Sequence, residues 1–276
     1  MKRTTYVIIG MLVAGLAVIC GAIFYASCHM VGRESADAVE IGGERKTVEL
    51  PECRVVKLLH SSIVREEHKR TVREPDRISY SLCQVPLSVS PADSGQGSFS
   101  YAGDMDEFLS MSLVGDTLLV SFDFSRKADL HSFAFVKIKS EQMELKIPST
   151  VQTVLVDVDA AAAFCDFRRD SLAFHTRGVA SVRNCRMNSL SARAVELKFV
   201  SGEVRDLHID LDEVHAWQVV ADSFHIDTEH LSGSREHWNS LQVGECRQVL
   251  WTPVGEEASL HLNLKQAAKL EIGEQP

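Results

Sequence analysis

The C-terminal half of the chain repeats a short pattern of polar and apolar positions. One or two small polar residues precede a large apolar residue, as in Asp170-Ser171-Leu172 and Asn188-Ser189-Leu190. We name the apolar positions anchors, and they lie 18, 17, 17, 17 and 19 residues apart: Leu172, Leu190, Leu207, Phe224, Leu241 and Leu260. An earlier coil is anchored at Val154. Repetition at this length predicts stacked coils, each of which buries the apolar face of its neighbours.

A second apolar position follows most anchors by about 10 residues, at Phe164, Val182, Val200, Trp217, Trp251 and Leu270. Two short strands per coil are typical of a parallel β-solenoid, which we expect over residues 151–276. Asp or Asn stands before most anchors and favours a turn, because its side chain bonds nearby backbone and tolerates left-handed geometry. Gly178 and Gly202 are expected at corners of the coils.

Residues 47–150 carry shorter apolar runs that predict strands and no helix. The runs lie within 47–64, 78–82, 85–89, 118–124, 133–138 and 143–147. Gly115 and Asp116 predict the turn of a hairpin, and Pro86 is expected to keep its strand at an edge or a bulge. Residues 91–103 are rich in Ser and Gly and predict a loop, while 27–46 has the composition of a linker.

The N-terminus carries an apolar stretch of membrane-spanning length. Residues 6–26 contain no charge, and about 20 such residues cross a bilayer as a helix. Lys2 and Arg3 precede the stretch, which predicts a cytoplasmic N-terminus, a single transmembrane helix over residues 1–26 and an extracytoplasmic body, periplasmic or on the cell surface. A cleaved signal would have a shorter apolar core. A lipoprotein attached at Cys28 is the alternative.

Charge and cysteine content argue against two classes of function, nucleic-acid binding and zinc binding. A formal net charge of -9 argues against a nucleic-acid binder, which needs a basic surface. The cysteines show no C-x-x-C pair, so a zinc site is not indicated. Disulfides Cys53–Cys83 and Cys165–Cys185 are conceivable after export, and buried free thiols are the favoured interpretation.

Three histidines and a group of acidic residues are candidates for a functional role. His208, His225 and His261 each follow an anchor, so the repeat predicts that they point outward and stack at one register. A solvated strand face is favoured over a metal site there. The acidic candidates, with Arg205 nearby, are Asp206, Asp210, Asp212, Glu213, Asp222 and Asp227. No catalytic, cofactor-binding or metal-binding residue is assigned, and no cofactor is expected.

The order of elements resembles a known bacterial family. The hairpin at Val114-Gly115-Asp116-Thr117-Leu118, the strand ending in Leu145-Lys146-Ile147-Pro148-Ser149, and the Ser-Leu coils with the sequence GVASVRNC at 178–185 are similar to the putative auto-transporter adhesin head domain, or GIN domain. The resemblance covers residues 47–272. It implies a right-handed parallel β-helix on the cell envelope and brings no catalytic residues.

Two function classes follow from these observations. The first is a membrane-anchored, non-enzymatic, adhesin-like module that binds an envelope protein or a glycan and no nucleic acid. The second is a carbohydrate-active enzyme of the parallel β-helix type, for which Asp210, Asp212, Glu213 and Arg205 are the candidates and would have to face one groove. A purely structural role as a spacer or assembly module is a third reading.

Overall fold

The computed structural model describes residues 38–60, 63–64, 77–93, 95–124, 135–241, 244–265 and 268–273, together with Gly15 and Ile19. The chain divides into Met1–Asp37 and one compact unit, Ala38–Pro276. Apart from Gly15 and Ile19, the membrane segment predicted over residues 1–26 lies outside the described residues, as does Cys28. Among the helices that the structure describes, none is both long and apolar enough to span a bilayer.

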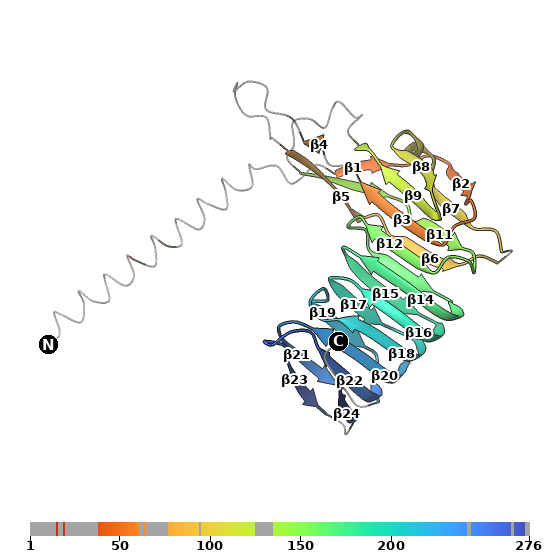
Figure 1. The fold of residues 1–276 in the computed structure, drawn as a ribbon. Helices are drawn as coiled ribbons and strands as arrows, with labels where there is room; N and C mark the ends of the chain where they lie inside the picture. The colour runs from red at the N-terminus through yellow and green to blue at the C-terminus, as the bar shows by residue number, and fades with distance from the viewer. Residues whose placement is uncertain are drawn as a thin grey trace, which may run out of the picture. The chain divides into compact units, whose positions relative to one another are not determined.

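A ten-stranded sheet forms one wall of the compact unit (Figure 1). Its order is β24-β22-β20-β18-β16-β14-β12-β3-β9-β8. Neighbours pair in parallel except at the hairpin β8–β9, which confirms the predicted turn at Gly115. The strands are β3 (Val55–His60), β8 (Leu109–Val114), β9 (Thr117–Phe122), β12 (Thr153–Asp157), β14 (Arg168–Thr176), β16 (Cys185–Arg193), β18 (Gly202–Asp210), β20 (Phe224–Gly233), β22 (Cys246–Pro253) and β24 (Lys269–Ile272).

An eight-stranded sheet forms the second wall, in the order β19-β17-β15-β13-β6-β11-β7-β2. Its strands are β2 (Arg45–Glu49), β6 (Leu87–Pro91), β7 (Ser98–Ala102), β11 (Met143–Ile147), β13 (Ala162–Cys165), β15 (Val179–Arg183), β17 (Glu196–Phe199) and β19 (Ala216–Val219). Two sequence predictions are wrong here. The predicted loop at 91–103 contains β7, and β6 lies inside the sheet because it begins after Pro86, whose missing N–H therefore costs no ladder bond.

Two smaller sheets and one helical turn complete the described body. A four-stranded sheet contains β1 (Ala38–Ile41), β10 (Phe135–Ser140), β5 (Arg77–Gln84) and β4 (Ile63–Val64), and β1 falls within the segment predicted as a linker. A two-stranded sheet pairs β21 (Glu236–Leu241) with β23 (Ser259–Leu264). A short 3-10 helix, η1 (Gly103–Glu107), was not predicted, because a single turn is too short to show helical periodicity.

The β-solenoid prediction is confirmed by how side chains align between coils. Leu172, Leu190 and Leu207 occupy one register of β14, β16 and β18, and all three are buried. Phe164 and Val182 are aligned on the facing sheet. The rings of Phe164 and Phe174 stack across the core with centroids 4.0 Å apart. Each buried anchor of this size contributes about 2 kcal/mol to folding.

The anchor prediction fails before Leu172, because Val154 lies opposite Phe174. It also fails after Leu207. The partner of Leu207 in the next coil is Glu229, whereas Phe224 lies opposite Gly202. The connection from β18 to β20 contains turns at residues 211–213 and 221–223, so 22 residues separate Leu207 from Glu229. Leu241 and Leu260 are strand residues of the separate β21–β23 sheet, so they do not continue the column.

The second apolar position is also shifted in the later coils. Phe199 and Val219, rather than Val200 and Trp217, continue the column of Phe164 and Val182. Trp251 and Leu270 belong to the ten-stranded sheet. A shift of one residue moves a side chain to the opposite face of its strand. Spacing along the sequence therefore does not predict which residues are buried where the coil length changes.

The polar pairs before Leu172 and Leu190 lie within strands, where they break the inside–outside alternation, and not in turns between strands. Asp170 and Ser171 are both exposed within β14, so the strand stops alternating there and resumes at Leu172. Asn188 lies at the same place in β16 and donates its amide to Asp170 Oδ1 over 3.0 Å. Asp206 lies inside β18, whereas Asp222 does occupy a turn. The prediction of a turn is therefore correct only for Asp222 among these residues.

The predicted corners are confirmed, because Gly178 lies in the bend between β14 and β15 and Gly202 begins β18 directly after the bend at Ser201. Gly202 also occupies a position that requires glycine. Its φ of 130° lies in a region that other residues rarely adopt. A Cβ atom there would lie 2.1 Å from the carbonyl oxygen of Cys185 in the preceding coil. Close approach of two coils therefore excludes a side chain.

Candidate functional site

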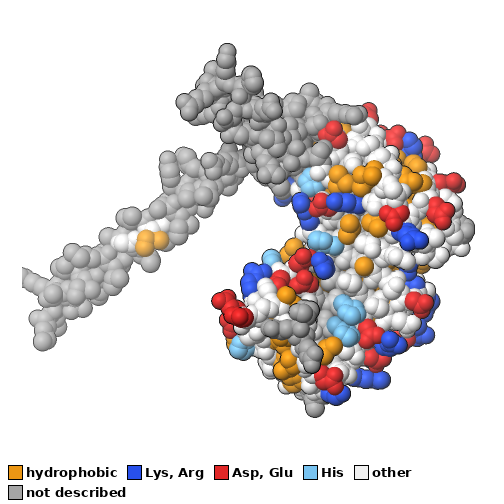
Figure 2. Space-filling model, viewed as in Figure 1, with side chains coloured by type: hydrophobic (Ala, Val, Ile, Leu, Met, Phe, Trp, Pro, Cys, Tyr) orange, Lys and Arg blue, Asp and Glu red, His pale blue; other side chains and the backbone are white. Residues whose placement is uncertain are grey.

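One row of outward side chains crosses the ten-stranded sheet near the C-terminal ends of its strands. The sheet register pairs neighbouring members, except that Arg193 and Asp210 are placed side by side because each follows a residue of the pair Ala192–Ile209. We name the row the outer column: Lys57, Leu155, His175, Arg193, Asp210, Ser232 and Thr252. Histidine and charged side chains of both signs are visible on the face shown in Figure 2. Because each coil contributes one residue, the repeat itself builds an extended polar surface.

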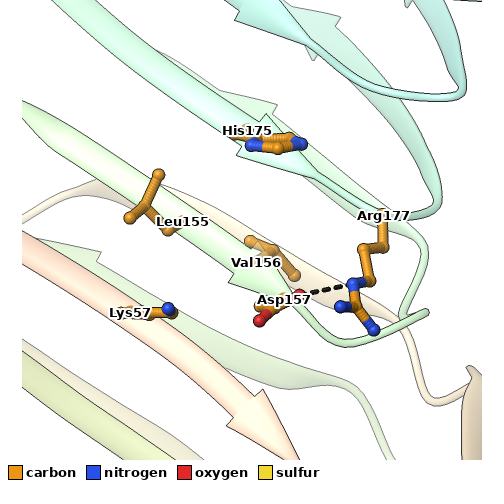
Figure 3. Close-up of a pocket in the computed structure, with 6 residues that line it drawn as sticks. All are labelled: Lys57, Leu155, Val156, Asp157, His175 and Arg177. Atoms are coloured by element: carbon orange, nitrogen blue, oxygen red, sulfur yellow. Dashed lines mark ion pairs between the residues drawn. The ribbon is translucent and has the colours of Figure 1, made fainter. Parts of the chain in front are cut away.

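A depression of about 180 Å³ lies over β3, β12 and β14. Figure 3 shows Lys57 and His175 on either side of Leu155, with the ion pair between Asp157 and Arg177 at one end. Lys57, Leu155 and His175 come from three successive strands at one register. The depression is therefore a direct product of strand stacking.

A second depression of about 270 Å³ lies over β16, β18 and β20. The rings of His208 and His230 stack there with centroids 4.3 Å apart. His230 Nε2 lies 3.1 Å from Asp206 Oδ1. Loss of hydration lowers the pKa of His208, and the charge of His230 lowers it further. The negative charge of Asp206 acts in the opposite direction and raises this pKa. His208 is therefore held toward its neutral form beside His230.

Glu213 connects the two depressions. Its carboxylate lies 3.5 Å from Arg193 Nη1 and 3.9 Å from His175 Nε2. Arg193 lines the second depression and His175 lines the first. The outer column therefore carries positive and negative groups side by side, which suits a polar partner more than a uniformly charged one.

The predicted stack of His208, His225 and His261 is wrong. His208 is aligned with His230, His225 with Glu203, and His261 with Trp238. The longer coil after Leu207 moves Phe224 and His225 to the start of β20, away from the level of His208. His230 was missed because it does not follow a recognised anchor. Within the described part of the chain, no cluster of three or more His, Cys, Asp or Glu side chains suits a metal ion.

The acidic candidates are only partly brought together. Asp210 lines the second depression, and Glu213 bonds Arg193 at the same place. Asp212 instead accepts a hydrogen bond from the backbone N–H of Ser234 and contacts His237. These contacts join the segment between β18 and β19 to the segment that leads into β21. Arg205 and Asp206 pair with each other, and hydrogen bonds from Arg205 and His230 lower the pKa of Asp206. Asp227 pairs with exposed Arg247.

A buried acidic pair lies behind the surface and has no counterpart in the sequence prediction. Glu229 is fully buried in the column of Leu207 and Val249. Burial raises its pKa to about 8, and the neighbouring carboxyl of Glu245 adds to the rise. Glu245 is also buried. Inside–outside alternation predicts Val or Leu at a buried position like that of Glu229. The burial of Glu229 is evident only once the pairing of β18, β20 and β22 is known.

The favoured prediction of buried free thiols is correct for Cys53 and Cys185, whereas Cys165 and Cys246 are half-buried. Cys53, Cys165, Cys185 and Cys246 are all free, so Cys165 and Cys185 form no disulfide with each other. Burial raises the pKa of Cys185 to about 11, which disfavours the reactive thiolate. None of these groups lines the outer column.

The fold and surface define an all-β solenoid with an exposed polar face. No protein-family model matches the chain, and no curated protein matches it. Among solved structures, it is similar to a protein described as a "putative adhesin" from Bacteroides fragilis, with 10% identity, a TM-score of 0.43, and coverage of 85% of this chain and 100% of that one. A "putative lipid binding protein" from Parabacteroides distasonis has 8% identity, a TM-score of 0.37, and coverage of 85% and 99%.

Proposed function

We propose that the chain is a non-enzymatic binding module of the bacterial cell envelope, related to the GIN domain family. The outer column recognises a polar partner, either an envelope protein or a glycan. One observation carries the proposal: two depressions share a row of outward side chains and are joined through Glu213. Rows of this kind on stacked coils are common recognition surfaces.

The membrane tether is part of the proposal. The apolar stretch over residues 6–26 has the length of a spanning helix, and the basic residues before it favour a cytoplasmic N-terminus. The body then faces the periplasm or the cell surface. Lipid attachment at Cys28 is the alternative route to the same location.

A crosslinking experiment tests recognition by the outer column. A photoreactive amino acid is placed at Ser232, which lines the second depression, in the full chain expressed in its native cells. The matched control places it at Ser181, which points outward from the opposite sheet. We expect a discrete adduct from Ser232 alone, reduced by Arg193→Glu and unaffected by Arg183→Glu. Equal labelling at both positions, or no adduct at Ser232, would contradict the proposal.

Fractionation tests the tether separately. The full chain should appear with membranes and become protease-sensitive from the outside, while deletion of residues 6–26 should release it from membranes or block its export. Cys28→Ala distinguishes the two routes, because only a lipoprotein loses lipid labelling and membrane retention on that change. A full-length chain that remains in the cytosol would contradict the location.

The enzyme hypothesis has one point in its favour. Asp210 and Glu213 both lie near Arg193, although Asp212 and Arg205 are engaged elsewhere. Incubation with acidic polysaccharides distinguishes the two functions. Chain cleavage that disappears with Asp210→Asn would establish the enzyme, whereas binding without new reducing ends supports the binding module.

A further inference from the structure

The eight-stranded sheet is interrupted between two successive coils. It ends at β19, and β21 of the following coil pairs with β23 and with no other strand that the structure describes (Figure 1). A regular solenoid would place β21 on β19. A crevice of about 300 Å³ instead lies between them, lined by residues of β19, by residues of β21 and by Glu245. This volume is at the lower end of the range for small-molecule sites, about 300–1,000 Å³.

Two residues that line this crevice each carry a side-chain N–H without an acceptor. Trp217 of β19 and Asn239 of β21 both line it. Trp217 Nε1 and Asn239 Nδ2 are buried and have no hydrogen-bond partner among the described residues. Leaving a buried donor unpaired costs about 1–3 kcal/mol. Trp217 belongs to one wall of the crevice and Asn239 to the other, so an oxygen atom of a ligand seated between β19 and β21 would remove this cost.

An aromatic platform lies at the edge of the crevice. Trp238 is 73% exposed, and its indole is stacked on the ring of His261 with centroids 4.2 Å apart and 12° between planes. One face of the indole is thus backed by His261. A large exposed aromatic side chain held flat in this way offers an apolar surface with a polar edge.

We infer that the β19–β21 crevice binds a neutral saccharide unit. A sugar ring has apolar C–H faces that pack on indole, and its hydroxyls both accept from Trp217 and Asn239 and donate to Glu245. Among the described residues that line the crevice there is no lysine or arginine, which disfavours an anionic ligand. The site is separate from the outer column, so each proposal can fail without the other.

Titration of the detergent-solubilised full chain tests this inference. The probes are N-acetylglucosamine, galactose, glucose and their β-linked disaccharides, followed by tryptophan fluorescence and calorimetry. We expect saturable binding of at least one probe, with Trp238→Ala weakening it about tenfold or more, as expected for a central aromatic contact. Trp238 is exposed, so this variant should retain its circular dichroism and unfolding temperature.

Two further variants test whether binding takes place in the crevice. Asn239→Asp replaces an amide donor with an acceptor and should also abolish binding, whereas His225→Ala, on the ten-stranded sheet, should leave it unchanged. An extended peptide of alternating Thr and Val tests the rival occupant, a strand added to the free edge of β19. Binding of that peptide in place of the sugars, or no binding of any sugar at millimolar concentration, would overturn the inference.

Discussion

At the scale of single residues, Glu229 is the least expected feature of the core. Its neighbours in the same column are Leu207 and Val249. A charged carboxylate is costly in such surroundings, so the group retains its proton instead. The carboxyl of Glu245 reinforces this, because two adjacent carboxyls disfavour ionisation.

Glu229 should make the protein less stable as pH rises. Its pKa in the folded chain is raised from 4.5 to about 8, so between these values the unfolded chain loses a proton that the folded chain keeps. The stabilisation that the protonated Glu229 gives to the folded state is therefore complete below about pH 4.5, and it is lost as the pH rises through about 8. Glu229→Gln should flatten this dependence and raise stability at pH 8 by about 1–3 kcal/mol. Urea unfolding at pH 4.5 and pH 8 measures both effects, and an unchanged slope would refute the assignment.

Leu207 and His208 form a matched pair of adjacent residues with opposite environments. Leu207 is buried in the anchor column, whereas His208 points outward. Leu207→Asp should unfold the C-terminal half, because it buries a charge where the chain needs an apolar group. His208→Ala should change stability by no more than about 0.5 kcal/mol. Thermal unfolding of the two variants, compared with the unmodified chain, checks the inside–outside assignment.

Gly202 supports a prediction about backbone geometry. Gly202→Ala should destabilise the protein by about 2 kcal/mol or more, because the added Cβ meets the Cys185 carbonyl and the positive φ is strained. Gly95→Ala is a suitable comparison, since Gly95 also has positive φ but has open space around its Cβ position. Chemical denaturation should show the larger loss for Gly202. Equal losses would mean that strain alone, and not the approach of the coils, decides the effect.

At the scale of elements, the coil repeat was predictable where coil length was constant. Spacings of 18 and 17 residues correctly aligned Leu172, Leu190 and Leu207. The hairpin at Gly115 followed from local turn chemistry. These features depend on short-range patterns, which a single sequence displays directly.

The later coils and the candidate site were not predictable in the same way. The connection after β18 is longer, and the Asp-Ser-Phe cue at 222–224 therefore falls at the start of β20. The alignment of His208 with His230 and the separation of β21 from β19 both depend on that change. Spacing rules assume a constant coil, so they place outward residues wrongly once an insertion occurs.

The last strand of the ten-stranded sheet, β24, has a free edge on which a second copy of the chain is expected to pair. It is an edge strand of the ten-stranded sheet, and Ile272 is 72% exposed. Exposed apolar edge strands pair readily with other chains, and a lysine on the edge discourages this. Ile272→Lys should lower self-association at high concentration, measured by sedimentation velocity, and leave the unfolding midpoint nearly unchanged. His225→Lys, away from the edge, should not alter self-association.

At the scale of the whole molecule, the N-terminal strands and the coils form one continuous structure. β3 and β9 extend the ten-stranded sheet, and β6 and β11 extend the eight-stranded sheet. The antiparallel strands β8, β7 and β2 lie at the ends of these sheets, where they terminate the parallel stacks. The outer column, the β19–β21 crevice and the N-terminal strands are therefore parts of one compact unit with a shared core.

The pairing pattern also sets an order of assembly. Most strands of the later coils find their partners 17 to 22 residues along the chain, whereas Ala38 pairs with Lys137 and Val55 with Thr153. Closing the longer loops costs more entropy before any contact forms, so these pairings are kinetically slow. The coils can propagate quickly from one neighbour to the next. During synthesis, β3 emerges early and must wait for β9 and then β12, so its apolar edge is exposed to chaperones or to misfolding until these strands are made.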